Sequence, residues 1–266
     1  MKKDETASLI KKYTNKEFVY FLPRANRAIK LALRFAKSKG LKKVVTADEG
    51  GWLTYIDYAK ALKMELVLVK SDHGIIKKFN YDNAVLLLNI MPAYAYLYTA
   101  KELAKLYKDT QLHNSLMISD VTACLGLDVS TYGDIILGSF GKHKPIMLGR
   151  GGFIATNNIE LKEFIRANSE EAELEFSELV RLLKNARDIH QNYYEINMRV
   201  KQDLKSFNII HPTRRGINVV IKCNDADRDK IIKYCHKKGY EYTQTPRFIR
   251  TLSPGISIEI KRREIL

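Results

Sequence analysis

The sequence lacks any apolar run approaching the roughly 20 residues that a membrane-spanning helix needs, and its first residues are charged with no apolar segment behind them. These absences predict a protein without a transmembrane span or a secretory signal. Cysteine is scarce: only Cys124, Cys223 and Cys235 occur, and their spacing fits no metal site. Three cysteines cannot all pair, so we expect a reducing, cytoplasmic environment.

Motifs for metal and nucleotide binding are also lacking. No metal-ligand spacing relates the histidines at positions 113, 190, 211 and 236. The glycine-rich segment Gly149-Arg-Gly-Gly152 is not a P-loop, because no Gly-Lys-Ser or Gly-Lys-Thr follows it. We therefore expect no metal site. The chain contains no internal repeat and no low-complexity linker.

Acidic residues are outnumbered, with 30 Asp and Glu against 45 Lys and Arg, which gives a formal net charge of +15. This excess favours an anionic substrate or a polyanionic partner. However, the cations Arg27, Lys30, Arg34 and Lys37 recur at helical spacing opposite apolar residues, which is typical of the wet face of an amphipathic helix. We therefore favour a solvated surface, and nucleic-acid binding stays open as an alternative.

Short apolar runs alternate with amphipathic segments along most of the chain, and the apolar fraction of 45% is typical of a globular protein. The expected strands are 43–47, 65–69, 84–88, 116–120, 134–138 and 153–155. The expected helices between them are 26–39, 52–63 and 95–107. Continuous apolar strands that alternate with helices predict an α/β fold, in which a mostly parallel sheet is covered by helices on both faces.

The remaining segments suggest how the chain is divided. A long helical stretch is expected from 159 to 206, broken near Asn168, and a smaller α+β unit follows with strands near 217–221 and 256–260 and a helix over 225–238. We expect an N-terminal arm (1–20), a large domain (21–166), linking helices (167–206) and a small α+β C-terminal domain (207–266).

Two charged residues follow neighbouring strands of the predicted sheet. Asp120 ends one apolar run, where an unpaired charge would be costly, and Lys144 lies just past the end of the next. Ligands collect at the carboxyl ends of parallel strands. A carboxylate and a lysine there can hold pyridoxal phosphate (PLP), with a Schiff-base lysine at one end and a pyridinium partner at the other. Taken alone, Asp120 could instead cap Thr122 and Ala123, and Lys144 could be one more surface lysine.

The segments around both residues resemble a known family. Asp120-Val-Thr-Ala-Cys-Leu-Gly126 resembles the aspartate segment of the fold-type-I PLP enzymes, in particular the DegT-type nucleotide-sugar aminotransferases. Ser139-Phe-Gly-Lys-His-Lys144 and the following Leu148-Gly-Arg-Gly-Gly152 resemble the Schiff-base segment of the same family. The pair His143-Lys144 is also similar to the cysteine desulfurases. Both alignments select Lys144 rather than Lys142, and the order of elements agrees from about Arg24 to Ile260.

The resemblance implies the cofactor PLP and a role for each matching residue. Lys144 would form the Schiff base, Asp120 would keep the ring nitrogen protonated, and Ser139 would bind the cofactor phosphate. Trp52 would stack on the pyridine ring. The cofactor site would also include Thr122 and the backbone amides of Ala25 and Asn26. Arg250 matches the small-domain arginine that grips a substrate carboxylate.

The sequence departs from the family at two points. The family's small Gly-Thr or Ser-Gly-Thr turn, which holds the phosphate, is replaced by Arg24-Ala-Asn-Arg27, and Ala123 stands where glutamine or histidine is common. The chain is also shorter than usual.

We therefore expect a cytoplasmic homodimer with a shared active site, a PLP-dependent aminotransferase that acts on an amino acid or an amino- or keto-sugar. The alternatives are another PLP reaction, such as a lyase or desulfurase, and a homologue of the fold that works as a binding or regulatory module without catalysis. A desulfurase needs a reactive cysteine on a mobile loop, whereas Cys223 and Cys235 fall at a strand end and in a helix.

Overall fold

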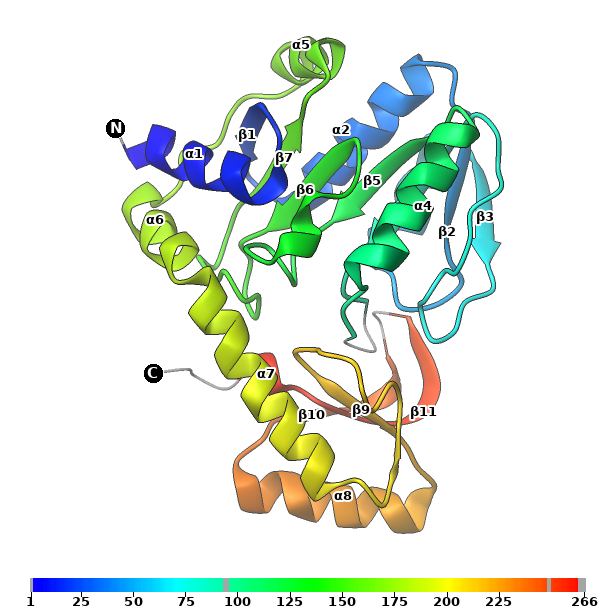
Figure 1. Cartoon of the computed structure of the whole chain (residues 1–266), viewed down its shortest axis with the longest axis vertical. Coiled ribbons are helices and arrows are strands. Elements are labelled where there is room, and N and C mark those ends of the chain that lie inside the picture. Colours follow the sequence, from blue (N-terminus) through cyan, green and yellow to red (C-terminus); the bar gives the residue numbers. More distant parts are fainter. Residues whose placement is uncertain (1, 93–95, 248–249, 263–266) are drawn as a thin grey trace.

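A seven-stranded sheet forms the centre of the larger part of the molecule (Figure 1), and its strand order is β1-β7-β6-β5-β4-β2-β3. The computed structural model describes residues 2–92, 96–247 and 250–262. The strands are β1 (Phe18–Leu22), β2 (Lys43–Ala47), β3 (Glu65–Val69), β4 (Ala84–Asn89), β5 (Leu116–Asp120), β6 (Ile135–Ser139) and β7 (Gly152–Thr156). Strands β2 to β6 are parallel, whereas β7 runs antiparallel to β6 and β1 antiparallel to β7.

Helices cover both faces of this sheet, because side chains alternate along each strand between two separate apolar clusters. In β4, for example, Leu86 and Leu88 belong to one cluster, and Val85 and Leu87 belong to the other. The first cluster packs under α1 (Lys2–Thr14), α4 (Ala100–Leu112) and α6 (Phe176–Lys184), and the second packs under α2 (Ala25–Ser38), α3 (Leu53–Ala61) and α5 (Ile159–Asn168). The predicted three-layer, mostly parallel α/β architecture is confirmed.

A second, antiparallel sheet is built from the end of the chain, in the strand order β10-β11-β9-β8. The long helix α7 (Ala186–Asp203) leads from the large sheet toward it (Figure 1). The sheet consists of β8 (Asn208–Ile209), β9 (Val219–Lys222), β10 (Tyr242–Arg247) and β11 (Thr251–Ile258), with α8 (Asp225–Lys238) packed against it. Helix α8 has the bounds expected from the sequence. Asn224 caps its first turn through Asp227 N–H, and Gly239 ends it at a φ of +69°.

The N-terminal segment is folded rather than extended. Helix α1 packs on α6, where the Tyr13 hydroxyl donates to the carbonyl of Leu183 at 2.7 Å, and the Lys184 ammonium lies 2.6 Å from the Glu5 carboxylate. Strand β1 then joins the large sheet, so it crosses the division expected between residues 20 and 21. The division into domains stays a prediction.

Two helical segments differ from the expected ranges. The helix expected over 95–107 begins at Ala100 instead, because Thr99 and Glu102 form a reciprocal capping box at its start. The long helical stretch expected from 159 to 206 has the expected break near Asn168, where α5 ends, and a second break at Asn185 that was not expected. Within the described part of the chain, no helix combines the length and the apolarity that crossing a bilayer would take.

Candidate active site

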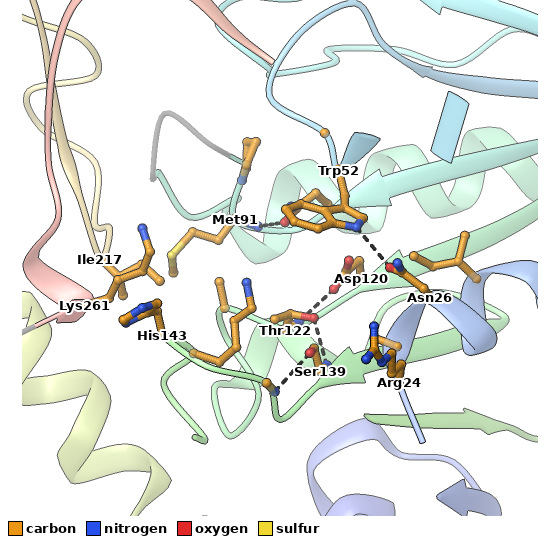
Figure 2. Close-up of a pocket in the computed structure, with 18 of the residues that line it drawn as sticks. Arg24, Asn26, Trp52, Met91, Asp120, Thr122, Ser139, His143, Ile217 and Lys261 are labelled. Carbon is orange, nitrogen blue, oxygen red and sulfur yellow. Dashed lines mark hydrogen bonds between the residues drawn. The ribbon is translucent and has the colours of Figure 1, made fainter. Parts of the chain in front are cut away.

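A cavity of about 350 Å³ opens at the carboxyl ends of β4, β5 and β6 and beside the loop that follows β2 (Figure 2). This volume is in the usual range of small-molecule sites. Parallel strands bring the polar residues at their carboxyl ends to one edge of the sheet, which is why residues from four separate loops meet there. The predicted site residues that line it are Ala25, Asn26, Trp52, Asp120, Thr122, Ser139 and Lys144.

Asp120 contributes a buried carboxylate to the cavity, with only 6% of the residue exposed. The Tyr55 hydroxyl donates to its Oδ2 at 2.7 Å, and the backbone N–H of Thr122 donates to its Oδ1 at 3.0 Å. A turn, not a helix, follows Asp120, so the carboxylate does not act as a helix cap. Both donors are neutral, and within the described residues no Lys, Arg or His lies within ion-pair distance of Asp120.

Lys144 lies in the loop after β6 and faces Trp52 across the cavity. Its Nζ lies 5.5 Å from the centroid of the indole ring. The indole is oriented by a hydrogen bond of 3.0 Å from its Nε1–H to Oδ1 of Asn26, which comes from the first turn of α2. The structure therefore brings the amine of Lys144 and the flat face of Trp52 into the same cavity. Figure 2 shows the indole of Trp52 and its hydrogen bond to Asn26.

The N-terminus of α2 forms another wall. Arg24 precedes the helix and makes no side-chain cap, and Ala25 and Asn26 of the first turn line the cavity. Helix α2 can start there because Gly152 has no Cβ, which would lie 2.7 Å from the backbone nitrogen of Ala25. A helix N-terminus presents backbone N–H groups and a partial positive charge, which favour an anion.

Ser139 and Thr122 connect the two strand ends that carry the site. The backbone N–H of Ser139 donates to Oγ1 of Thr122 at 2.9 Å, and the Ser139 Oγ accepts from the N–H of Gly141 at 3.1 Å. Both side chains line the cavity (Figure 2). This link fixes the end of β6 against the turn that follows Asp120.

Arg250 is not among the residues that line the cavity. Its guanidinium donates through Nη2 to the carbonyl of Ala47 at 2.7 Å and also to the carbonyl of Asp48, and only 7% of the residue is exposed. The structure therefore places this side chain against the loop after β2, next to Gly51 of the cavity wall. Its role in gripping a substrate carboxylate stays a prediction.

Sequence reasoning missed several residues of the site. Tyr55 lies one helical turn after Trp52 and is fully buried beside Asp120, but nothing in the sequence pairs the two. The C-terminal part of the chain adds Asn218, just before β9, and Lys261, after β11, to the cavity wall. The Lys261 Nζ donates to Asn218 Oδ1 and to the buried carboxylate of Glu259, at 2.6 Å in both cases. The sequence could not predict these two residues, because they reach the cavity only when the end of the chain packs beside the large sheet.

Arg24, Lys144, Arg150 and Lys261 bring positive charge to the lining, and Asp120 is the carboxylate among its described residues. Two of these cations are paired, Arg150 with Glu175 and Lys261 with Glu259. Burial lowers the pKa of His143, and the neighbouring charges of Arg262 and Lys142 lower it further. The cavity therefore favours an anionic ligand. In the described parts of the chain, no three His, Cys, Asp or Glu side chains gather in a way that could hold a metal ion.

These groups fit PLP. A buried carboxylate that accepts only from neutral donors lacks a cationic partner among the described residues, and a protonated pyridine nitrogen would supply one. The amine of Lys144 suits the aldehyde, the Trp52 face suits the ring, and the N-terminus of α2 suits the phosphate.

Comparison with known proteins agrees with this architecture. No curated protein matches the sequence significantly, and a family profile described as "MJ1341 family C-terminal domain" matches residues 187–266. Solved structures match almost the entire chain. A DegT DnrJ EryC1 StrS aminotransferase from Brucella abortus has a TM-score of 0.71 at 13% identity, and the match covers 97% of this chain and 84% of that one. The chain has the fold of the PLP-dependent transferases of fold type I.

Two further structures show the same fold under different enzyme names. Helicobacter pylori PseC, an aminotransferase involved in the biosynthesis of pseudoaminic acid, matches with a TM-score of 0.73 at 14% identity, over 97% of this chain and 85% of that one. The histidinol-phosphate aminotransferase from Clostridium acetobutylicum matches with a TM-score of 0.69 at 13% identity, over 97% and 83% of the two chains. Likeness at this level of identity concerns the fold, and function has to be argued from the site.

Proposed function

We propose that this protein is a PLP-dependent aminotransferase, similar to the DegT type, that transfers an amino group between an amino acid and a keto compound through Lys144. The observation that carries the proposal is the cavity itself: the amine of Lys144, the indole of Trp52 and the buried carboxylate of Asp120 line one space at the carboxyl ends of the strands. A homodimer with a shared active site and a cytoplasmic location belong to the same proposal.

Each residue has a definite task in this mechanism. The bound cofactor supplies an electron sink that stabilises a carbanion at the α-carbon of the substrate. Lys144 Nζ would hold the cofactor through its aldehyde, and this amine would move a proton to and from the α-carbon of the substrate as general acid and base. Asp120 holds a proton at the ring nitrogen, because its buried carboxylate stabilises a cation there.

The other cavity residues bind and orient. Trp52 packs against the flat ring, and Asn26 fixes the angle of the indole. The phosphate would be held by the backbone amides at Ala25 and Asn26, the hydroxyls of Ser139 and Thr122 and the charge of Arg24, even though the family's small Gly-Thr or Ser-Gly-Thr turn is absent. The positive charge of Arg24 in the lining then favours a substrate that carries a carboxylate.

Spectroscopy of the purified protein with PLP tests the proposal. We expect a visible absorption band on addition of PLP, and we expect borohydride to fix the cofactor covalently to the peptide that contains Lys144, as read by mass spectrometry. Amino acids should bleach the band. A protein that forms no band with PLP would be a homologue of the fold that works without this cofactor, and salt-dependent binding of RNA would then favour the nucleic-acid alternative.

A cofactor that binds but exchanges no amino group would point to another PLP reaction. A panel of amino donors and keto acceptors, with products followed by mass spectrometry, separates transamination from lyase or desulfurase chemistry. Burial raises the pKa of the Cys235 thiol to about 11 and also raises that of Cys223. Neither therefore has the thiolate character that a desulfurase cysteine needs.

A further inference from the structure

Tyr55 contacts the proposed catalytic carboxylate from outside the cavity. It lies in α3, it is 0% exposed, and its hydroxyl donates to Oδ2 of Asp120 at 2.7 Å. Its ring lies close to Gly51 of the cavity wall, where an added Cβ would lie 3.2 Å from Cδ2 of Tyr55. Burial and the charge of Asp120 raise the pKa of Tyr55 well above its ordinary value, so the hydroxyl keeps its proton and stays a donor.

The two donors to Asp120 divide its oxygens between them. Thr122 N–H occupies one lone-pair position of Oδ1, and the Tyr55 hydroxyl occupies one position of Oδ2. Each carboxylate oxygen has a second lone-pair position that can still accept. The terminal torsion of an aspartate is broad and weakly preferred, so a carboxylate held at one oxygen alone can rotate. Two donors on different oxygens prevent this rotation.

We infer that Tyr55 is a positioning residue, which fixes the Asp120 carboxylate so that it meets the ring nitrogen of a pyridine cofactor. The inference rests on the proposed function and adds a group that touches neither cofactor nor substrate. Without the Tyr55 hydroxyl, the Asp120 carboxylate could rotate, and only some of its orientations would place an oxygen against the ring nitrogen. Binding that depends on this nitrogen would weaken, and binding through the phosphate and the aldehyde would not.

The test compares PLP with 1-deaza-PLP, in which carbon replaces the ring nitrogen. Dissociation constants are measured by absorbance or fluorescence titration for the wild type, for Tyr55→Phe and for Tyr98→Phe. Tyr98 is the matched control: it is equally buried, its hydroxyl accepts from Ile76 N–H and donates to the carbonyl of Gly74, and it does not line the cavity. We expect the preference for PLP over 1-deaza-PLP to fall roughly tenfold in Tyr55→Phe, the effect of one hydrogen bond to a charged group, and to stay unchanged in Tyr98→Phe.

The outcomes separate this inference from the proposed function. A wild type that binds neither compound overturns the proposed function and the inference with it. A wild type that prefers PLP, together with a Tyr55→Phe variant of equal or higher preference, overturns the inference and leaves the function standing. Equal weakening of both compounds in Tyr55→Phe does the same, because it shows a structural role only.

A second variant keeps the test usable if Tyr55→Phe fails to fold. Replacing Tyr55 by p-aminophenylalanine retains a donor at the same place, but a neutral N–H donates more weakly than a phenol. We expect a preference for PLP between those of the wild type and Asp120→Asn. A preference as low as that of Asp120→Asn, despite the retained donor, would count against the inference.

Discussion

Charged side chains are used in two different ways on the two sides of this molecule. At the carboxyl ends of the large sheet, Lys144 and Asp120 line a cavity and contact an aromatic ring and neutral donors. Beside the small sheet, Arg250 and Lys201 are as deeply buried as Asp120, at 7% and 6% exposure against 6%, but they donate to backbone carbonyls. The difference teaches that burial of a charged side chain does not by itself identify a functional residue. A charged group that faces an open cavity is a candidate, whereas one bonded to backbone carbonyls has a structural role.

The first prediction concerns the two lysines of the loop after β6. Lys144→Ala should abolish covalent attachment of PLP and lower the rate of transamination by roughly 10²- to 10⁴-fold, because the general acid and base is lost. Borohydride trapping and single-turnover absorbance measure the two effects. The control is Lys142→Ala, since Lys142 is exposed and does not line the cavity. Equal losses in both variants would contradict the assignment of Lys144.

The second prediction concerns Arg250. Arg250→Met leaves the carbonyls of Ala47 and Asp48 without their charged donor in a buried place, so we expect a loss of about 2–4 kcal/mol in the free energy of unfolding. Urea titration measures it. The control is Arg181→Met, because Arg181 forms an exposed pair with Glu178 on one helix, which should be worth less than about 1 kcal/mol.

Measuring amino-acid binding by Arg250→Met tests whether Arg250 acts at the site, like Lys144, or only supports the structure. If Arg250→Met retained wild-type stability but no longer bound amino acids, Arg250 would belong with Lys144 as a site residue, as the family resemblance implies. If stability falls and the residual folded protein still binds amino acids, its role is to hold the small sheet on the loop after β2.

The third prediction concerns Lys201, whose ammonium donates to the carbonyls of His211 and Arg214. Burial lowers its pKa to about 8, against an ordinary value of 10.5. Between these values the unfolded chain binds a proton that the folded chain does not bind. The free energy of unfolding should therefore rise with pH between about 8 and 10.5, by at most about 1.4 kcal/mol per pH unit.

Urea unfolding at a series of pH values checks this prediction, with Lys201→Met as the comparison. The variant should lose this component of the pH dependence, whereas Lys205→Met, at an exposed position nearby, should keep it. The same slope in all three proteins would show that the two carbonyls keep Lys201 charged, and that this buried amine is not destabilised by its surroundings.

The sequence predicted most of the large sheet, because continuous apolar runs and helical periodicity are local signals. Strands β2 and β3 and helix α8 lie where the sequence places them. The misses have particular causes. Helix α1 is charged and only weakly amphipathic, so its helical character depends on packing against α6. The start of α4 was readable in the capping box Thr99-x-x-Glu102 but was placed one turn too early.

Strand β3 shows the limit of local signals most clearly. Its apolar run Glu65–Val69 predicts a strand buried on both faces, but the sheet order places it at an edge, where Leu68 is 45% exposed. The residues of one strand do not encode which neighbours the strand will have.

The sequence by itself determined that Asp120 and Lys144 would follow neighbouring strands, because parallel strands send their carboxyl ends to one edge. Only the tertiary structure decided what surrounds these two residues. It placed Tyr55 on the far side of the Asp120 carboxylate, turned Arg250 toward backbone carbonyls instead of the cavity, and brought Lys261 and Asn218 to the cavity wall. Such contacts join segments up to about 200 residues apart. They depend on how the layers of the fold pack together, and the local sequence pattern of a segment does not contain that information.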